Sequence, residues 1–257
     1  MSKNSLVLPI LRMLTLVLLV LASESGTAKP AVLVFFGGFG SCKVGGWPSE
    51  IKARGEIDNL ADSLRAAGFY DLLDSRSCFA IGNNRVFSEF DDEGAFESSP
   101  NELFETIRDA ASAHGGPVFL MGHSHGGTMA MLASTWLEDL DVRGLATIDP
   151  ISMENCSAGG FFTQIFDFGS DAGCRQSPAD LVPIYPRIKL AIKDFWLNFY
   201  QNQHSLVHSG PIPLASTNTY VGYSYAGNTP TGTHGAIQLD SRVWGAITEN
   251  VLESALR

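Results

Sequence analysis

The chain has 257 residues, of which 45% are hydrophobic and 17% are charged, and its net charge is −10. This length and composition are typical of a globular α/β protein with one domain or two small ones. The acidic balance argues against nucleic-acid binding, which requires a basic face, and against electrostatic docking on anionic lipid.

The first 28 residues have the pattern of a secretory signal peptide. Lys3 and Arg12 give a basic start, and residues 13–22 form a largely apolar run. A short segment of small and polar residues follows, as it does before a cleavage site. The sequence therefore predicts a secreted or periplasmic protein from which this segment is removed.

Cleavage is expected after Ala28, because Gly26 and Ala28 are the small residues that a signal peptidase requires before the cut. Cleavage after Ala22 is the second choice. The alternative is an uncleaved membrane anchor, although the apolar run is shorter than the ~20 residues of a spanning helix. The folded domain is expected over residues 29–257.

The first strand is predicted at 31–36, a continuous apolar run that suits a strand buried on both faces of a parallel sheet. Glycine-rich residues 37–41 follow, where backbone N–H groups can approach another group closely. Apolar residues at helical spacing predict a helix over 55–67 that Gly68 ends. The next strand is expected at 75–81.

The polar stretch 82–99 is predicted to be a surface loop. Ser98 or Ser99 then caps a helix that runs through His114. Pro100 falls at an early position of this helix, where proline is tolerated.

A G-x-S-x-G motif, Gly122-His123-Ser124-His125-Gly126, lies between a strand predicted at 117–122 and a helix predicted to run to about Leu140. This context gives the motif its meaning, because a sharp turn there exposes the Ser124 hydroxyl. Gly122 and Gly126 stand where a Cβ would collide with the turn, and Gly127 lets the helix pack closely. The first N–H groups of the helix favour negative charge nearby. The alternative is a serine that only caps the helix.

A further strand is predicted at 142–148, and it ends at Asp149-Pro150. Residues 151–187 contain two cysteines, three prolines and several aromatic residues, and they are predicted to be an irregular insertion. This insertion is either a lid or acyl-chain wall, or a disulfide-pinned loop with an ordinary packing role. A helix leading into a short strand at 195–200 is expected next.

The last predicted elements are a β-like segment at 217–225, a loop at 229–235 that carries His234, and a helix at 239–256 that begins near Asp240 or Ser241. Alternating strands and helices predict a mostly parallel, doubly wound sheet flanked by helices. The fold class is therefore α/β, in a single domain with an aromatic, cysteine-containing insertion after the strand that bears Asp149.

Four cysteines, Cys42, Cys78, Cys156 and Cys174, follow the signal segment. An even count behind an export signal suggests two disulfides, and local pairing (Cys42–Cys78 and Cys156–Cys174) is preferred among three connectivities. The spacings contain no C-x-x-C and resemble no zinc motif.

A serine hydroxyl is a poor nucleophile at neutral pH and requires a general base that a carboxylate orients. Ser124 is followed by Asp149 at a strand end and by His234 before the last helix. This is the chain order Ser, acid, His of α/β-hydrolases, and all three would lie at the carboxyl edge of the sheet. The catalytic residues are therefore predicted to be Ser124, Asp149 and His234.

Other candidates for the base and the acid are weaker. His123 and His125 flank Ser124 and cannot easily turn back onto its Oγ, and His114 precedes the opposite end of the elbow strand. The remaining rivals are His204 and His208 for the base and Asp171, Asp180 and Asp194 for the acid.

The oxyanion of the reaction requires two preorganised N–H donors. One is predicted at His125, the residue after the nucleophile, and the other in the glycine-rich loop 37–40. A nucleotide phosphate cradle is the alternative for that loop, but the loop lacks both the Walker lysine spacing and G-x-G-x-x-G.

On these motifs the chain resembles the α/β-hydrolase superfamily, more narrowly its extracellular lipases and esterases, over residues 31–256. The resemblance is most specific at Gly122–Gly127, at Leu145–Pro150 and at His234–Ile237. It implies the α/β-hydrolase fold, the acid at Asp149 and the second oxyanion donor at the N–H of Phe39. The chain departs from the family in two ways, since no histidine precedes the oxyanion glycine and the family's earliest strands are absent, which implies a trimmed fold.

The function implied is an exported serine hydrolase that cleaves carboxylic esters, lipid-like or hydrophobic, through an acyl-enzyme. No metal or cofactor is expected. The expected partner is a small-molecule or lipid ester, with transient contact to a lipid interface. An amidase, peptidase or thioesterase with the same triad is the alternative, because the triad does not choose the leaving group. A non-catalytic secreted binding module on the same scaffold is a further alternative.

Overall fold

The computed structural model describes residues 31–39, 48–68, 73–80, 85–89, 96–98, 100–151, 179–202, 209–222 and 232–257. The strands in this part of the chain form an eight-stranded sheet in the order β4-β3-β2-β1-β5-β6-β7-β8. They are β1 (Val32–Phe39), β2 (Leu73–Ala80), β3 (Arg85–Glu89), β4 (Phe96–Ser98), β5 (Val118–His123), β6 (Val142–Ile148), β7 (Phe195–Tyr200) and β8 (Thr217–Tyr220).

The sheet is parallel from β2 through β1, β5, β6 and β7 to β8. Only β3 and β4 add antiparallel pairs, at the β2 edge. Strands β1, β5 and β6 lie at the centre, and their described side chains are almost all buried. This burial explains why β1 and β5 begin as continuous apolar runs in the sequence.

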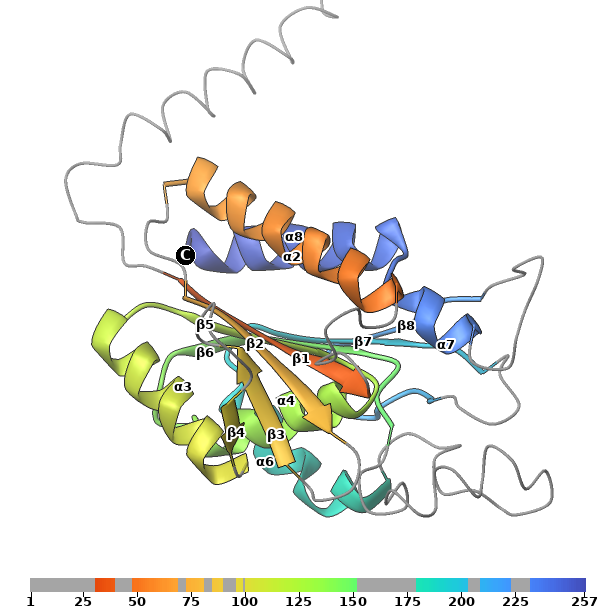
Figure 1. The fold of residues 1–257 in the computed structure, drawn as a ribbon, viewed down its shortest axis with the longest axis horizontal. Helices are drawn as coiled ribbons and strands as arrows, with labels where there is room; N and C mark the ends of the chain where they lie inside the picture. Colours follow the sequence, from red (N-terminus) through yellow and green to blue (C-terminus); the bar gives the residue numbers. More distant parts are fainter. Residues whose placement is uncertain are drawn as a thin grey trace, which may run out of the picture.

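Helices cover both faces of the sheet (Figure 1). Helices α2 (Pro48–Ala66) and α8 (Ser241–Ala255) lie side by side on one face. The other face carries α3 (Pro100–His114), α4 (His125–Trp136) and α6 (Tyr185–Ala191). The α/β-hydrolase expectation of a doubly wound, mostly parallel sheet is therefore confirmed.

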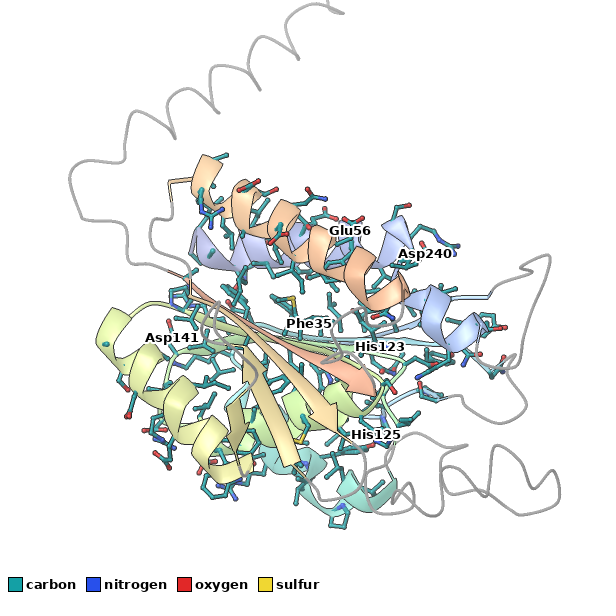
Figure 2. All side chains as sticks on the ribbon, viewed as in Figure 1. Phe35, Glu56, His123, His125, Asp141 and Asp240 are labelled. Atoms are coloured by element: carbon teal, nitrogen blue, oxygen red, sulfur yellow. The ribbon has the colours of Figure 1, made fainter. Side chains whose placement is uncertain are left out.

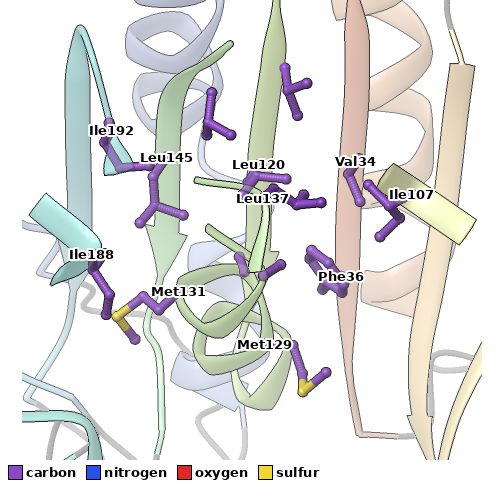
Figure 3. Packing of buried hydrophobic residues seen from close by; sticks show 14 of the residues in the cluster. Val34, Phe36, Ile107, Leu120, Met129, Met131, Leu137, Leu145, Ile188 and Ile192 are labelled. Carbon is purple, nitrogen blue, oxygen red and sulfur yellow. The ribbon is translucent and has the colours of Figure 1, made fainter. Parts of the chain in front are cut away.

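Each face of the sheet has its own apolar core. On the α4 face, Phe36, Leu120 and Leu145 of the sheet pack with Met129 and Ile188 of the helices (Figure 3). On the other face, sheet residues pack against α2 and α8, which contribute the buried residues Ile57, Leu60, Ala61, Leu64, Val243, Trp244, Ile247 and Val251. The two cores hold the central strands rigidly between helix layers, so the strand ends have fixed positions.

Several element boundaries differ from the sequence predictions. The stretch predicted to be a loop at 82–99 contains β3 and β4, because short edge strands need few apolar residues. Strand β1 continues through the glycines to Phe39, and α4 ends at Trp136, before Leu140. His234 lies in a short helix, α7 (Gly232–Ile237), rather than in a loop.

The end of the predicted insertion is part of the core. A 3₁₀ helix, η3 (Ala179–Ile184), leads into α6, and Leu181, Tyr185 and Ile188 are buried against the α4 face. Residues 152–178 of the insertion lie outside the described residues.

Two other predictions fall outside the described residues. These are the signal peptide and the disulfides, since the structure does not describe Cys42, Cys156, Cys174 or the side chain of Cys78. Within the described part of the chain, no helix combines the length and the hydropathy needed to cross a membrane.

Candidate active site

Ser124 sits in a sharp turn between β5 and α4. Its backbone has φ 58° and ψ −128°, a left-handed conformation that is uncommon for a residue with a side chain. Although Ser124 occupies the N-cap position, its side chain makes no capping hydrogen bond. This geometry argues against a serine that only caps the helix and agrees with the predicted nucleophile turn.

The glycines of the motif allow this turn to form. A Cβ on Gly122 would lie 2.1 Å from the carbonyl oxygen of Gly126, and a Cβ on Gly126 would lie 1.9 Å from that of Phe36. A Cβ on Gly127 would come within 2.9 Å of Pro150. The start of α4 therefore packs directly against the end of β1 and against the segment after β6, with no room for side chains.

Backbone hydrogen bonds tie the Ser124 turn to the end of β6. The N–H of Ser124 donates to the carbonyl of Ile148 at 3.0 Å. The carbonyl of Ser124 accepts from the N–H groups of Gly127 at 3.0 Å and Ile151 at 3.2 Å. The segment that carries Asp149 is thus fixed beside the serine.

Asp149 follows β6 directly and is fully buried. Its own backbone has φ 44°, and its N–H donates to the carbonyl of Phe199 at 2.7 Å. In the described part of the chain its carboxylate accepts five hydrogen bonds. Oδ1 accepts from the N–H of Gln201 (3.3 Å) and from the N–H (3.0 Å) and hydroxyl (2.7 Å) of Ser209, and Oδ2 accepts from Nε2 of Gln201 (2.8 Å) and Nδ1 of His234 (2.6 Å).

These donors keep the buried carboxylate ionised. Burial by itself raises the pKa of Asp149, since it penalises the charged form. The hydrogen bond and charge of His234, with the hydrogen bonds from Gln201 and Ser209, outweigh burial and lower the pKa below its ordinary value. The site therefore holds a permanent anion at neutral pH.

His234 reaches this anion from α7, 85 residues further along the chain. A carboxylate can only accept, so Nδ1 carries the proton of the 2.6 Å hydrogen bond. In the neutral imidazole this leaves Nε2 as the basic nitrogen. The side chain of His234 is 13% exposed, so it is mostly shielded from water.

His123, which immediately precedes Ser124, also contacts His234. Its Nε2 lies 2.9 Å from the main-chain oxygen of His234, and the two ring centroids are 4.6 Å apart. His123 is 2% exposed. His234 therefore contacts both Asp149, which follows β6, and His123, at the end of β5.

The two predicted oxyanion donors lie near the ends of β1 and β5. His125 is buried and is the first residue of α4. Phe39 is the last residue of β1, beyond the point at which pairing with β5 ends at Phe36. The β1 register on β2 shifts between Phe36 and Phe39, and such bulges change the direction of a strand. The role of the Phe39 N–H remains a prediction.

The rival residues fall elsewhere. His114 ends α3, before the opposite end of β5, and Asp194 precedes β7 at that same edge, where it accepts from the Ser254 hydroxyl. The structure does not describe Asp171, His204, His208 or the side chain of Asp180. In the described residues, no group of three or more His, Cys, Asp or Glu side chains could hold a metal ion.

Sequence reasoning missed Gln201 and Ser209. Both reach Asp149 across more than fifty residues of sequence, and neither belongs to a motif. The available signal for Gln201 was its position just after β7, since residues there share an edge with Asp149. The contact of His123 with His234 also joins residues far apart in sequence, and no motif indicates it.

Comparisons with known proteins give similar structures but no close relative. No protein-family model and no curated protein matches the chain. A monoacylglycerol lipase of Paleococcus ferrophilus is 15% identical, with a TM-score of 0.44, over 90% of this chain and 96% of its own. Est1E from Butyrivibrio proteoclasticus, solved with ferulic acid, is 14% identical, with a TM-score of 0.44, over 91% and 93%.

The Vlm2 thioesterase domain is 13% identical, with a TM-score of 0.35, over 86% of this chain and 92% of its own. At these values the likenesses say nothing about the substrate of this protein. The fold rests instead on its own features, which are the parallel sheet covered on both faces, the strained serine between β5 and α4, and the aspartate that follows β6. On those features the chain has the α/β-hydrolase fold.

Proposed function

We propose that the protein is a serine hydrolase that cleaves carboxylic esters through an acyl-enzyme. The observation that carries this proposal is the 2.6 Å hydrogen bond between the buried Asp149 carboxylate and His234 Nδ1, beside a strained serine that caps no helix. Residues held this way are costly for stability and are typical of a catalytic constellation.

In the acylation step Ser124 Oγ attacks the ester carbonyl carbon while His234 Nε2 takes the hydroxyl proton. Asp149 holds the imidazole by Nδ1 and stabilises the imidazolium that forms. The tetrahedral intermediate then collapses, and His234 returns the proton to the departing alkoxide, which leaves as an alcohol. The acyl group remains on Ser124 as an ester.

In the deacylation step water attacks the acyl-enzyme with the same base. His234 takes the proton of the water and later gives it to Ser124 Oγ, so that a carboxylic acid leaves and the enzyme is regenerated. In both steps the oxyanion would be bound by the backbone N–H groups of His125 and Phe39. Each such donor typically contributes about 3 kcal/mol to the transition state.

We further propose hydrophobic or lipid-like esters as the substrate class and export as the route to them. The aromatic residues of 151–187 support the first point and the apolar run 13–22 supports the second. The mass of the mature N-terminus in a secretion host tests export, since cleavage after Ala28 gives a chain that begins at Lys29.

The deciding experiment is labelling with a fluorophosphonate, which reacts preferentially with an activated serine. Wild type should gain one adduct in its intact mass, and Ser124→Ala should gain none. Ser134→Ala is the matched control, because that serine is buried in the same helix and its hydroxyl donates to the carbonyl of Met131. A folded wild type that stays unlabelled would remove the main support for the proposal.

A substrate panel then distinguishes the leaving groups. Esters of increasing acyl length, with an amide and a thioester of the same acyl group, are compared by kcat/KM. We expect the esters to be cleaved fastest, with a preference for longer chains. If the amide or the thioester were cleaved faster, the proposed triad would stand, but the proposed substrate class would change from esters to amides or thioesters.

A further inference from the structure

His123 joins the two halves of the candidate site. It is the last residue of β5 and the neighbour of Ser124 in sequence, and it is almost completely buried. Its Nε2 lies 2.9 Å from the main-chain oxygen of His234, a residue 111 positions away. Its ring also packs on the ring of His234, with centroids 4.6 Å apart and planes inclined by 33°.

The chemistry of this contact fixes its direction. A carbonyl oxygen can only accept, so Nε2 of His123 must carry the proton and donate. Nδ1 of the His234 ring, in turn, donates to Asp149. His234 is therefore held at two points. Asp149, after β6, binds its ring, and His123, in β5, binds its main chain.

The two contacts control different movements. The bond to Asp149 fixes one end of the imidazole, but it leaves α7 able to shift or tilt around that point. A second bond to the backbone of His234 removes this freedom. His123 directly precedes Ser124 in the chain. The second bond therefore fixes the position of the base, His234, relative to the nucleophile, Ser124.

We propose that His123 is a positioning residue that sets the placement of His234 relative to Ser124. The inference rests on the proposed function, in which Ser124 is the nucleophile and His234 the base. His123 exchanges no proton with the substrate. Its contribution is geometric, and misplacement of a reacting group by about 1 Å can reduce a rate by a factor of about 100.

Two substitutions separate the hydrogen bond from the ring contact. His123→Phe keeps an aromatic ring against His234 and removes the donor. His123→Gln removes the ring but keeps an NH₂ group that can take the place of Nε2–H. Both are assayed by the rate of fluorophosphonate labelling and by kcat and KM for a short, soluble ester, with Ser134→Ala as the control for a lost buried donor.

We expect His123→Phe to lower kcat and the labelling rate by at least about tenfold with KM changed less than twofold, since bound geometry rather than affinity is lost. His123→Gln should recover most of the rate, and Ser134→Ala should match wild type. Recovery by the donor alone is a result that a simple packing role cannot produce.

A measurement on the wild type covers the case in which His123→Phe does not fold. Proton-detected nitrogen NMR of the histidine rings should show His123 Nε2 carrying a proton, with the signal assigned by its loss in His123→Gln. An unprotonated Nε2 would overturn the inference. So would a folded His123→Phe that is labelled within twofold of the wild-type rate. If the wild type itself is not labelled, the proposed function fails first and the inference falls with it.

Discussion

Asp149 is a buried anion whose neighbours supply donors to both of its oxygens. In an apolar interior an isolated carboxylate would take up a proton. Here Ser209 and the Gln201 N–H donate to Oδ1, and the Gln201 side chain shares Oδ2 with His234, so the carboxylate is both charged and fixed in orientation. At the scale of single residues, these donors support the carboxylate that orients His234, the proposed base.

The Ser209 hydroxyl provides a direct test of that support. Ser209→Ala removes the 2.7 Å hydrogen bond to Oδ1 and leaves the 3.0 Å bond from the Ser209 N–H. We expect unfolding to become easier by about 2 kcal/mol, since the acceptor is charged. The kcat should fall by up to about tenfold, well short of the ~10⁴-fold typical of replacing a triad acid. Urea unfolding and ester hydrolysis measure the two effects.

Ser216→Ala is the matched control for this substitution. Its hydroxyl is exposed and bonds to Lys189 and to the N–H of Trp196, away from Asp149. It should leave kcat unchanged. Equal losses of activity in the two variants would mean that Ser209 acts only through general stability.

Ser124, Asp149 and His234, the proposed site residues, carry signals in the sequence that Gln201 and Ser209 lack. Ser124 stands in a local motif, and Asp149 and His234 follow from chain order and strand ends. Gln201 and Ser209 have no such signal, because their roles arise only when separate strand ends meet at one edge. Tertiary contacts of this kind are not encoded in the spacing of neighbouring residues.

At the scale of elements, the segment that carries Ser209 is held by two asparagines of the sheet. The side chain of Asn218 in β8 bonds both the N–H (2.7 Å) and the carbonyl (2.9 Å) of Ile212. Asn198 in β7 donates to Asn218 at 2.8 Å and to the carbonyl of Gly210 at 3.0 Å. The connection before β8 is thus pinned to the sheet on the side from which Ser209 meets Asp149.

The junction of β1 with α4 constrains Ser124, the proposed nucleophile, through a close approach of two backbones. Gly126→Ala would place a methyl group 1.9 Å from the Phe36 carbonyl oxygen. Relieving this clash would require the backbone of β1 or α4 to move. We expect a loss of about 2 kcal/mol or more, as for overpacked cores. Because α4 must move away from β1, fluorophosphonate labelling of Ser124 should also slow strongly.

Gly245→Ala is the control for this prediction, and its expected sign is opposite. Gly245 is exposed within α8, and a Cβ there meets nothing within 4 Å. Alanine should stabilise the helix by about 0.5–1 kcal/mol and leave labelling unchanged. If thermal unfolding showed both variants to be equally stable, the close approach of α4 to β1 would be wrong.

The elements predicted well are those with burial on both faces. Strand β6 was predicted with the bounds that it has, and β7 was predicted as a strand after a helix, because apolar and aromatic density marks central strands. Strands β3 and β4 were missed because an edge pair can be polar. Helix α7 was missed because its six residues, which include two glycines, are too few for helical periodicity to show.

At the scale of the whole molecule, the candidate site lies at one end of the parallel strands, and a cluster of ion pairs lies at the other end. The carboxyl ends of β5 and β6 carry His123, Ser124 and Asp149. Asp141 lies at the opposite edge, far from His123 in Figure 2, and pairs with Arg143 and Lys193. The fold thus places one buried anion in the site and one half-exposed anion at the far edge.

Asp141 and Asp149 can therefore be compared for their effects on the pH dependence of stability. Partial burial raises the pKa of Asp141, but hydrogen bonds and charges from Lys193 and Arg143 outweigh it and lower the pKa. The direction is the same as for Asp149, while the exposure differs. Ion pairs near the surface are screened by solvent and salt, so Asp141→Asn should have a small effect that shrinks further as salt is added.

Asp149→Asn should have a large effect on the free energy of unfolding that depends on pH. The folded-state pKa of Asp149 lies below its unfolded value of about 3.9, so the stabilisation is complete above about pH 4 and is lost as the pH falls through the folded-state pKa. The difference between wild type and Asp149→Asn, measured by urea unfolding, should therefore be fully present at pH 5. It should exceed about 2 kcal/mol there, because the new amide N–H groups meet only donors, and it should shrink below about pH 4. A difference that stayed constant down to pH 3 would mean that the donors around Asp149 do not hold it as an anion, and the orientation of His234 would then need another cause.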